Sequence, residues 1–203
     1  MRLKLAHLFR SVSDRPITVV SGLPRSGTSM MMSILQAGGM EILTDELRAA
    51  DEDNPRGYYE LERVKQLKQG DIAWIGQAEG KVVKIISALL EDLPDRHRYK
   101  IIFMRRAMAE ILASQRQMLI RRGEAADKVD DAQMAEMFQE HLKRVRVWLA
   151  NQANMEILYI DYNDLMNDPA AQVENIQAFL SIPLDLDAMR AVPDASLYRQ
   201  RKT

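Results

Sequence analysis

The chain has 203 residues, with 28 Lys and Arg against 29 Asp and Glu, a formal net charge of −1, 47% hydrophobic residues and no cysteine. This length suffices for one hydrophobic core without disulfides or a structural metal, so we expect a single domain over residues 1–203. The lack of cysteine excludes thiol catalysis, disulfide scaffolds and cysteine-ligated metal clusters, and it fits a cytoplasmic location. The balanced charge argues against nucleic-acid partners, and no apolar run is long enough to predict a transmembrane segment.

The charge is unevenly distributed along the chain. Residues 41–62 hold eight acidic and two basic residues, whereas residues 99–128 hold seven basic and three acidic ones. A neutral chain that separates its charge in this way is suited to binding an anion beside a segment that supplies carboxylates.

Apolar segments of strand and helix type alternate along the chain. A short β-branched run at 17–21 predicts a buried strand, and residues 28–37 predict a helix that ends at Gly38-Gly39. Further strands are predicted at 81–86, 99–104 and 155–162, and further helices at 107–122, 131–150 and 169–180. The helix at 131–150 carries Met137, Val145 and Leu149 on one apolar stripe, which is expected to face the core. This order predicts a three-layer α/β fold of the P-loop type, with a mostly parallel sheet flanked by helices. Its ligand site is expected at the carboxyl ends of the strands.

The segment between the first strand and the first helix has the spacing of a phosphate-binding loop. Gly22, Gly27 and Ser29 match the pattern G-x-x-x-x-G-K-(S/T), but Thr28 stands in the lysine position. This spacing wraps backbone N–H groups around an anion at a helix N-terminus. The loop instead carries its positive charge at Arg25, between the two glycines.

Three ordered motifs resemble those of the sulfotransferase family. The loop SGLPRSGTS resembles the family's 5′-phosphosulfate loop, and Arg106 with Ser114 eight residues later resembles its arginine and serine pair for the donor's 3′-phosphate. The segment that begins at Tyr162 resembles a third motif, whose tyrosine lies near the donor nucleotide. The likeness spans residues 16–183, and Met108 replaces the family's usual proline two residues after the arginine.

This resemblance implies 3′-phosphoadenosine 5′-phosphosulfate (PAPS) as donor and 3′,5′-adenosine bisphosphate (PAP) as product. A donor with two anionic clusters needs two cationic sites, and Arg106 with Ser114 suits the second one; Arg105 is the alternative to Arg106. The basic C-terminal residues Arg199, Arg201 and Lys202 are expected either to fold over the 3′-phosphate or to form a frayed end. The residues implied in donor binding are Pro24, Arg25, Ser26, Gly27, Thr28, Ser29, Arg106, Ser114, Tyr162, Arg199 and Arg201.

Catalysis needs positive charge on the sulfuryl oxygens and a base for the acceptor. Arg25 is the first predicted cation. The resemblance implies Lys84 as the second, because many members carry a lysine at this position, although a lysine at a strand end also fits a solvent-exposed position.

The base is predicted among acids, because Ile86 stands where many small-molecule sulfotransferases carry histidine. We expect His97 and His141 to be solvated. Glu46 lies 21 residues after Arg25, as the catalytic glutamate does in other members, and Asp45 is its neighbour. The alternative for both acids is helix capping or solvation.

The leading interpretation is therefore a sulfotransferase that acts on a hydroxyl or amine of a small-molecule or peptide acceptor, without a metal. A P-loop kinase or nucleotide triphosphatase is the first alternative, because Asp161 ends an apolar strand as a Walker B aspartate does. A non-catalytic nucleotide-binding protein of the same fold is the second.

Overall fold

The computed structural model describes residues 15–45, 57–123 and 130–193. Within these ranges four strands form one sheet in the order β2-β1-β3-β4, and every pair in it is parallel. The strands are β1 (Ile17–Gly22), β2 (Val82–Lys84), β3 (Tyr99–Arg105) and β4 (Met155–Asp161). The order places β1 between β2 and β3, and it pairs with both. All four strands therefore end at the same edge of the sheet.

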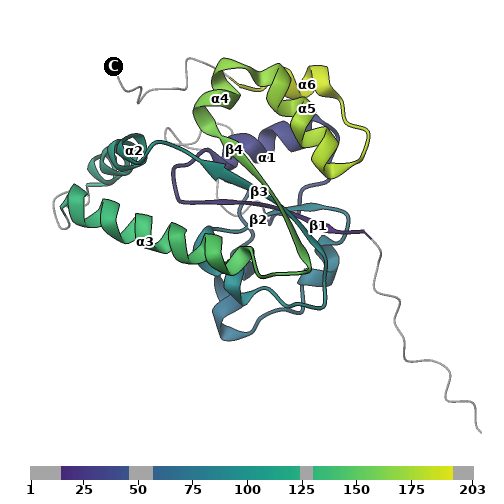
Figure 1. Cartoon of the computed structure of the whole chain (residues 1–203), viewed down its shortest axis with the longest axis horizontal. Coiled ribbons are helices and arrows are strands. Elements are labelled where there is room, and N and C mark those ends of the chain that lie inside the picture. Colours follow the sequence, from purple (N-terminus) through teal and green to yellow (C-terminus); the bar gives the residue numbers. More distant parts are fainter. Residues whose placement is uncertain (1–14, 46–56, 124–129, 194–203) are drawn as a thin grey trace, which may run out of the picture.

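Helices cover both faces of the sheet, so the predicted three-layer α/β architecture is confirmed (Figure 1). One face carries α1 (Thr28–Ala37), α5 (Pro169–Leu180) and α6 (Leu186–Arg190). The other face carries α3 (Asp131–Leu149) and the 3₁₀ helices η1 (Glu62–Gln69), η2 (Ile75–Ala78) and η3 (Ser87–Asp92). The remaining helices, α2 (Met108–Arg121) and α4 (Tyr162–Asn167), follow β3 and β4 directly.

Strand alternation explains why consecutive residues in the middle of the central strands are apolar. Val19 and Ile101 point into the core under η1, η3 and α3, whereas Val20 and Ile102 point into the core under α1 and α5. All four side chains are fully buried. A strand covered on both faces buries apolar side chains on each of them, and each such side chain contributes about 1.5–3 kcal/mol through burial.

Two elements differ from the prediction. Strand β2 is shorter than residues 81–86, because the chain turns after Lys84 and Ile86 becomes the N-cap of η3. Helix α3 has the predicted bounds, but Met137 is 64% exposed and only Val145 and Leu149 are buried. The N-terminal part of α3 extends past the sheet, so its apolar residues have no sheet surface to cover (Figure 1).

In the part of the chain that the structure describes, no helix has both the length and the apolar character needed to span a bilayer.

Candidate active site

The glycine loop joins β1 to α1 at the carboxyl edge of the sheet. Gly22 and Gly27 have φ angles of 146° and 98°, which a residue with a side chain rarely adopts. A Cβ on Gly27 would lie 2.5 Å from the Tyr162 ring, so glycine also lets α4 approach the loop. Arg25, at φ 70°, adopts the left-handed conformation without being glycine. The loop is thus held in a strained conformation of the kind found at ligand-binding sites.

The first turn of α1 is suited to an anion. Its N-cap is Gly27, which offers no side chain to the helix N–H groups, and the first turn contains no acidic residue. The N–H groups and the helix dipole therefore favour a negative ligand at this end. Pro24 is exposed, Ser26 is buried, and Arg25, Gly27, Thr28 and Ser29 are half-buried. The hydroxyl of Ser26 donates to the Leu23 carbonyl at 2.7 Å, so in this structure it braces the loop.

Arg25 and Ser114 come together although 89 positions separate them. Arg25 Nε donates to Ser114 Oγ at 2.9 Å, and Arg106 Nη1 donates to the carbonyl oxygen of Arg25 at 3.2 Å. The side chains of Arg106 and Ser114 are both buried. The predicted residues of the two anion sites thus meet around one loop.

Arg106 is held by a buried network that the sequence analysis missed. Its Nε donates to Glu110 Oε2 at 2.8 Å, and the two side chains are only 8% and 4% exposed. Asn163 Nδ2 donates to the other oxygen of Glu110 at 3.3 Å. The guanidinium carbon lies 4.3 Å from the centre of the Tyr162 ring, a cation–π distance. These contacts orient Arg106 and offset the cost of burying its charge. The signal in the sequence is Glu110, which lies four residues after Arg106 in the first turn of α2.

Lys84 points into the site and is 8% exposed, so the alternative of a solvent-exposed strand-end lysine is wrong. Its Nζ lies 3.3 Å from Ser29 Oγ and donates to the carbonyl oxygen of Tyr58. The carboxylate of Glu60 lies 3.7 Å from the same nitrogen. Lys84 therefore places a positive charge at the first turn of α1, on the side of the loop toward β2.

The predicted acids lie in a segment that runs beside β2. Ile42 forms a parallel bridge with Val82, which brings residues 41–45 to the edge of the sheet. Asp45 Oδ2 accepts from the backbone N–H of Glu62 at 2.5 Å, at the start of η1. Glu46, Arg199 and Arg201 lie outside the described residues, so the structure gives no positions for these predicted site residues.

The expectation that His97 is solvated is wrong, because the residue is 9% exposed. Its Nδ1 lies 3.1 Å from Glu79 Oε1, and this pairing compensates for the burial of the ring. His141 is half-buried on α3, where its Nε2 lies 2.8 Å from Ser87 Oγ. Burial, followed by the charge of Arg144, lowers the pKa of His141 below its ordinary value. Both rings therefore have hydrogen-bonding partners within the fold, and that of His141 lies on η3.

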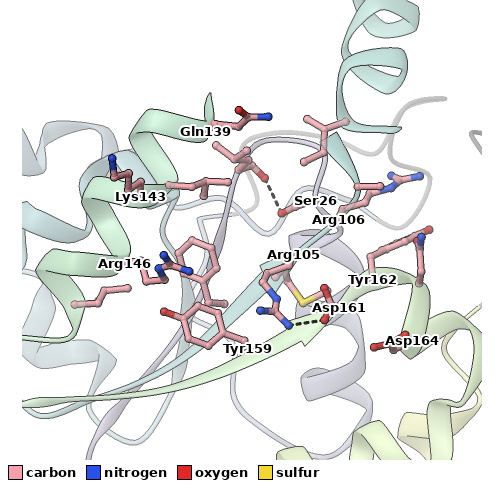
Figure 2. Close-up of a pocket in the computed structure, with 18 residues that line it drawn as sticks. Ser26, Arg105, Arg106, Gln139, Lys143, Arg146, Tyr159, Asp161, Tyr162 and Asp164 are labelled. Atoms are coloured by element: carbon pink, nitrogen blue, oxygen red, sulfur yellow. Dashed lines mark hydrogen bonds and ion pairs between the residues drawn. The ribbon is translucent and has the colours of Figure 1, made fainter. Parts of the chain in front are cut away.

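A pocket of about 890 Å³ opens at the carboxyl ends of β3 and β4, next to the loop (Figure 2). Phe103, Leu142 and Tyr159 contribute apolar surface, and Lys143 and Arg146 of α3 add positive charge. Ser26, Arg106 and Tyr162 also line the pocket, but Arg25 and Ser114 do not. The pocket therefore adjoins the predicted donor site without coinciding with the Arg25 and Ser114 contact.

Comparison with known sequences decides the family. The sequence model of the sulfotransferase domain matches residues 15–202. The chain belongs to the sulfotransferase family. It is accordingly a transferase. A comparison with curated protein sequences gave no significant match.

Solved sulfotransferase structures share the fold. The sulfotransferase domain of the olefin synthase from Synechococcus PCC 7002 is 17% identical, with a TM-score of 0.56 over 91% of this chain and 79% of that one. STF1 from Mycobacterium tuberculosis is 18% identical, with a TM-score of 0.58 over 91% and 72%. The mouse sulfotransferase SULT7A1 complexed with PAP is 18% identical, with a TM-score of 0.50 over 88% and 62%.

Asp161, the residue that resembles a Walker B aspartate, forms an ion pair with an arginine in this sulfotransferase. Asp161 Oδ2 lies 2.5 Å from Arg105 Nη2, and Figure 2 shows the two side chains facing each other. Arg105 also lies 5.3 Å from the centre of the Tyr159 ring. Arg105 and Asp161 are register partners at the ends of β3 and β4, so their side chains share a face of the sheet. This pairing gives Arg105 a carboxylate partner at the end of β4, whereas Arg106 donates to the loop carbonyl of Arg25.

Proposed function

We propose that this sulfotransferase moves a sulfuryl group from PAPS to a hydroxyl or amine of a small-molecule or peptide acceptor. The observation that carries the proposal is the arrangement of Arg25, Arg106 and Ser114. Arg25 from the loop after β1, Arg106 from the end of β3 and the Ser114 hydroxyl of α2 meet at one loop. A donor with two separate anionic clusters matches two cationic groups better than a simple triphosphate does.

The phosphosulfate end of PAPS would lie on the first turn of α1. There the backbone N–H groups, Thr28 and Ser29 supply hydrogen-bond donors, and Arg25 and Lys84 supply charge. The 3′-phosphate would take Arg106 and Ser114. A hydroxyl that accepts from Arg25 still has its own proton to donate to a phosphate oxygen. Tyr162, packed between Arg106 and Gly27, would support the nucleotide side of the site.

Transfer requires the acceptor oxygen or nitrogen to bond to sulfur while the bond from sulfur to the 5′-phosphate oxygen breaks. The leaving electron pair stays on the phosphate, so negative charge grows on PAP as the bond breaks. Lys84 and Arg25 are positioned to stabilise that charge, and their partners hold them in place before the reaction begins. The acceptor also loses a proton, for which Asp45 and Glu46 remain the bases predicted from sequence.

Thermal unfolding tests donor recognition before an acceptor is known. PAP at 100 times its dissociation constant should add about 2.7 kcal/mol of stability, a rise in melting temperature of roughly 5–10 °C for a chain of this size. ATP with Mg²⁺ at the same concentration should add much less. Stabilisation by ATP with Mg²⁺ but not by PAP would refute the proposal.

Incubation with radiolabelled PAPS and a panel of phenols, alcohols and amines then tests the transfer itself. The expected result is a labelled acceptor and one PAP for each transfer. An Arg106→Lys variant should require a higher PAPS concentration for half-maximal rate. Arg105→Lys should behave as the wild type does, because Arg105 faces Asp161. Binding of PAP without transfer or donor hydrolysis would indicate a non-catalytic nucleotide-binding protein instead.

A further inference from the structure

We propose that Glu60 is the catalytic base of this sulfotransferase, an inference that rests on the proposed function. Its carboxylate lies 3.7 Å from Lys84 Nζ, and that nitrogen lies 3.3 Å from Ser29 Oγ in the first turn of α1. Lys84 therefore connects Glu60 to the helix turn that follows the loop predicted to hold the sulfuryl group. The Glu60 side chain is 26% exposed, which leaves it accessible to an acceptor entering from solvent.

The backbone around Glu60 is fixed from several directions. Its carbonyl oxygen accepts from Thr44 Oγ1 at 2.7 Å and from the N–H of Asp45 at 3.3 Å. The carbonyl of Tyr58 accepts from Lys84, which ties the same segment to β2. A base held in this way is positioned before the acceptor binds, as efficient proton transfer requires.

Tyr59 adds a further constraint next to Glu60. Its φ of 51° is a left-handed conformation that a bulky residue rarely adopts. The phenol of Tyr59 donates to Gln36 Oε1 at 3.0 Å, and its oxygen accepts from Ser33 Oγ at 3.1 Å, so both contacts are with α1. The unusual backbone at Tyr59 thus sends its ring to α1 and leaves the next side chain, Glu60, beside Lys84. Strained backbone conformations concentrate at functional sites.

Asp45 has a different environment, although it lies close to Glu60 in the fold. Its carboxylate accepts from the backbone N–H of Glu62, which begins η1. This is the contact of a helix-capping acid. Between these two described acids, the geometry favours Glu60 for contact with the reacting group and Asp45 for fixing the loop.

The proposed step balances protons and electrons. The Glu60 carboxylate takes the proton of the acceptor O–H while the acceptor oxygen bonds to sulfur. The bond from sulfur to the 5′-phosphate oxygen breaks, and its electron pair leaves with PAP beside Lys84 and Arg25. The products are the sulfated acceptor, PAP and a protonated Glu60, which then returns its proton to solvent.

The experiment compares Glu60→Gln, Glu60→Asp and the control Glu62→Gln, whose side chain pairs with Lys65 at the surface. PAP affinity is measured first by calorimetry. The rate of transfer from PAPS is then measured with 4-substituted phenols of decreasing pKa, and PAPS hydrolysis measures transfer to water. Asp45→Asn and Glu46→Gln are assayed in parallel.

We expect Glu60→Gln to lower kcat about 100-fold or more with the least acidic phenols and to leave PAP affinity within threefold of the wild type. The loss should shrink as the phenol becomes more acidic, because an acidic acceptor ionises without a base. Glu60→Asp should recover part of the rate, and Glu62→Gln should match the wild type.

Equal losses with all phenols, or weakened PAP binding, would overturn the inference and make Glu60 a positioning residue for Lys84. A wild-type rate in Glu60→Gln with a large loss in Glu46→Gln or Asp45→Asn would overturn it in favour of those acids. These results differ from failure of the proposed function, in which the wild-type enzyme neither binds PAP nor consumes PAPS.

Discussion

Arg25 Nε donates a 2.9 Å hydrogen bond to Ser114 Oγ, which joins the glycine loop after β1 to helix α2 after β3. Arg106 reinforces this connection by donating to the carbonyl oxygen of Arg25. The two predicted anion sites are therefore coupled, because the loop that would hold the phosphosulfate also contacts both residues that would hold the 3′-phosphate. A change at either site is expected to alter binding of the whole donor.

Replacing Ser114 with alanine removes one hydroxyl from this junction. We expect PAP affinity to fall about 10- to 150-fold, since a hydrogen bond to a charged group contributes about 1.5–3 kcal/mol. Calorimetric titration with PAP measures the change. Ser181→Ala is the control, because Ser181 Oγ donates to the Ala178 carbonyl at the end of α5, outside the site. Unchanged PAP binding in Ser114→Ala would remove Ser114 from the donor site.

Arg106→Lys keeps the positive charge but loses the planar, multidentate donor group. We expect PAP affinity to fall about 10- to 100-fold, because a single ammonium cannot hold Glu110, the loop carbonyl and a phosphate together. The matched control is Arg105→Lys, whose side chain pairs with Asp161 at the surface. A larger loss in Arg105→Lys than in Arg106→Lys would reverse the assignment of the two neighbouring arginines.

Gly27→Ala tests the close approach of α4 to the loop. The new Cβ would meet the Tyr162 ring at 2.5 Å and would sit at a φ of 98°, so we expect a loss of about 2–5 kcal/mol in the free energy of unfolding. Gly70→Ala also has a positive φ, but nothing lies within 4 Å of its Cβ. Its cost should be about 1–2 kcal/mol. Denaturant melts compare the two variants, and equal costs would show that Tyr162 yields to the new methyl group.

The pKa of His141 gives a pH dependence of stability with a definite sign. Burial and Arg144 lower the pKa in the folded state, so the unfolded chain binds the proton more readily, with an ordinary pKa of about 6.5. The stabilisation that depends on neutral His141 is complete above that value and is lost as the pH falls through the lower folded-state pKa. His141→Gln should therefore lose less stability than the wild type between about pH 7.5 and about pH 5 in urea melts. An identical acid sensitivity in the two proteins would contradict this assignment.

Much of the fold follows from residue order. The buried run at 17–21, the glycine spacing and the helix from Thr28 predict strand, loop and helix because each depends on local backbone preferences. The alternation of strands and helices predicts the parallel sheet. The predicted length of β2 and the predicted burial of α3 were inaccurate, because both depend on tertiary structure. Strand length depends on where the chain turns, and exposure of Met137 depends on how far α3 projects beyond the sheet.

The sequence by itself determined the P-loop fold, the sulfotransferase likeness and the choice of Arg25 and Arg106 as cations, because these depend on motifs whose spacing is readable along the chain. Only the tertiary structure decided which groups face one another. It pairs Arg106 with Glu110 and Asn163, turns Arg105 toward Asp161, buries Lys84 beside Glu60 and gives His97 a carboxylate partner. Such pairings join residues from different strands and helices, and side-chain direction at the end of a strand depends on register with its neighbours. Contacts of that kind leave no periodic or local signal in the sequence.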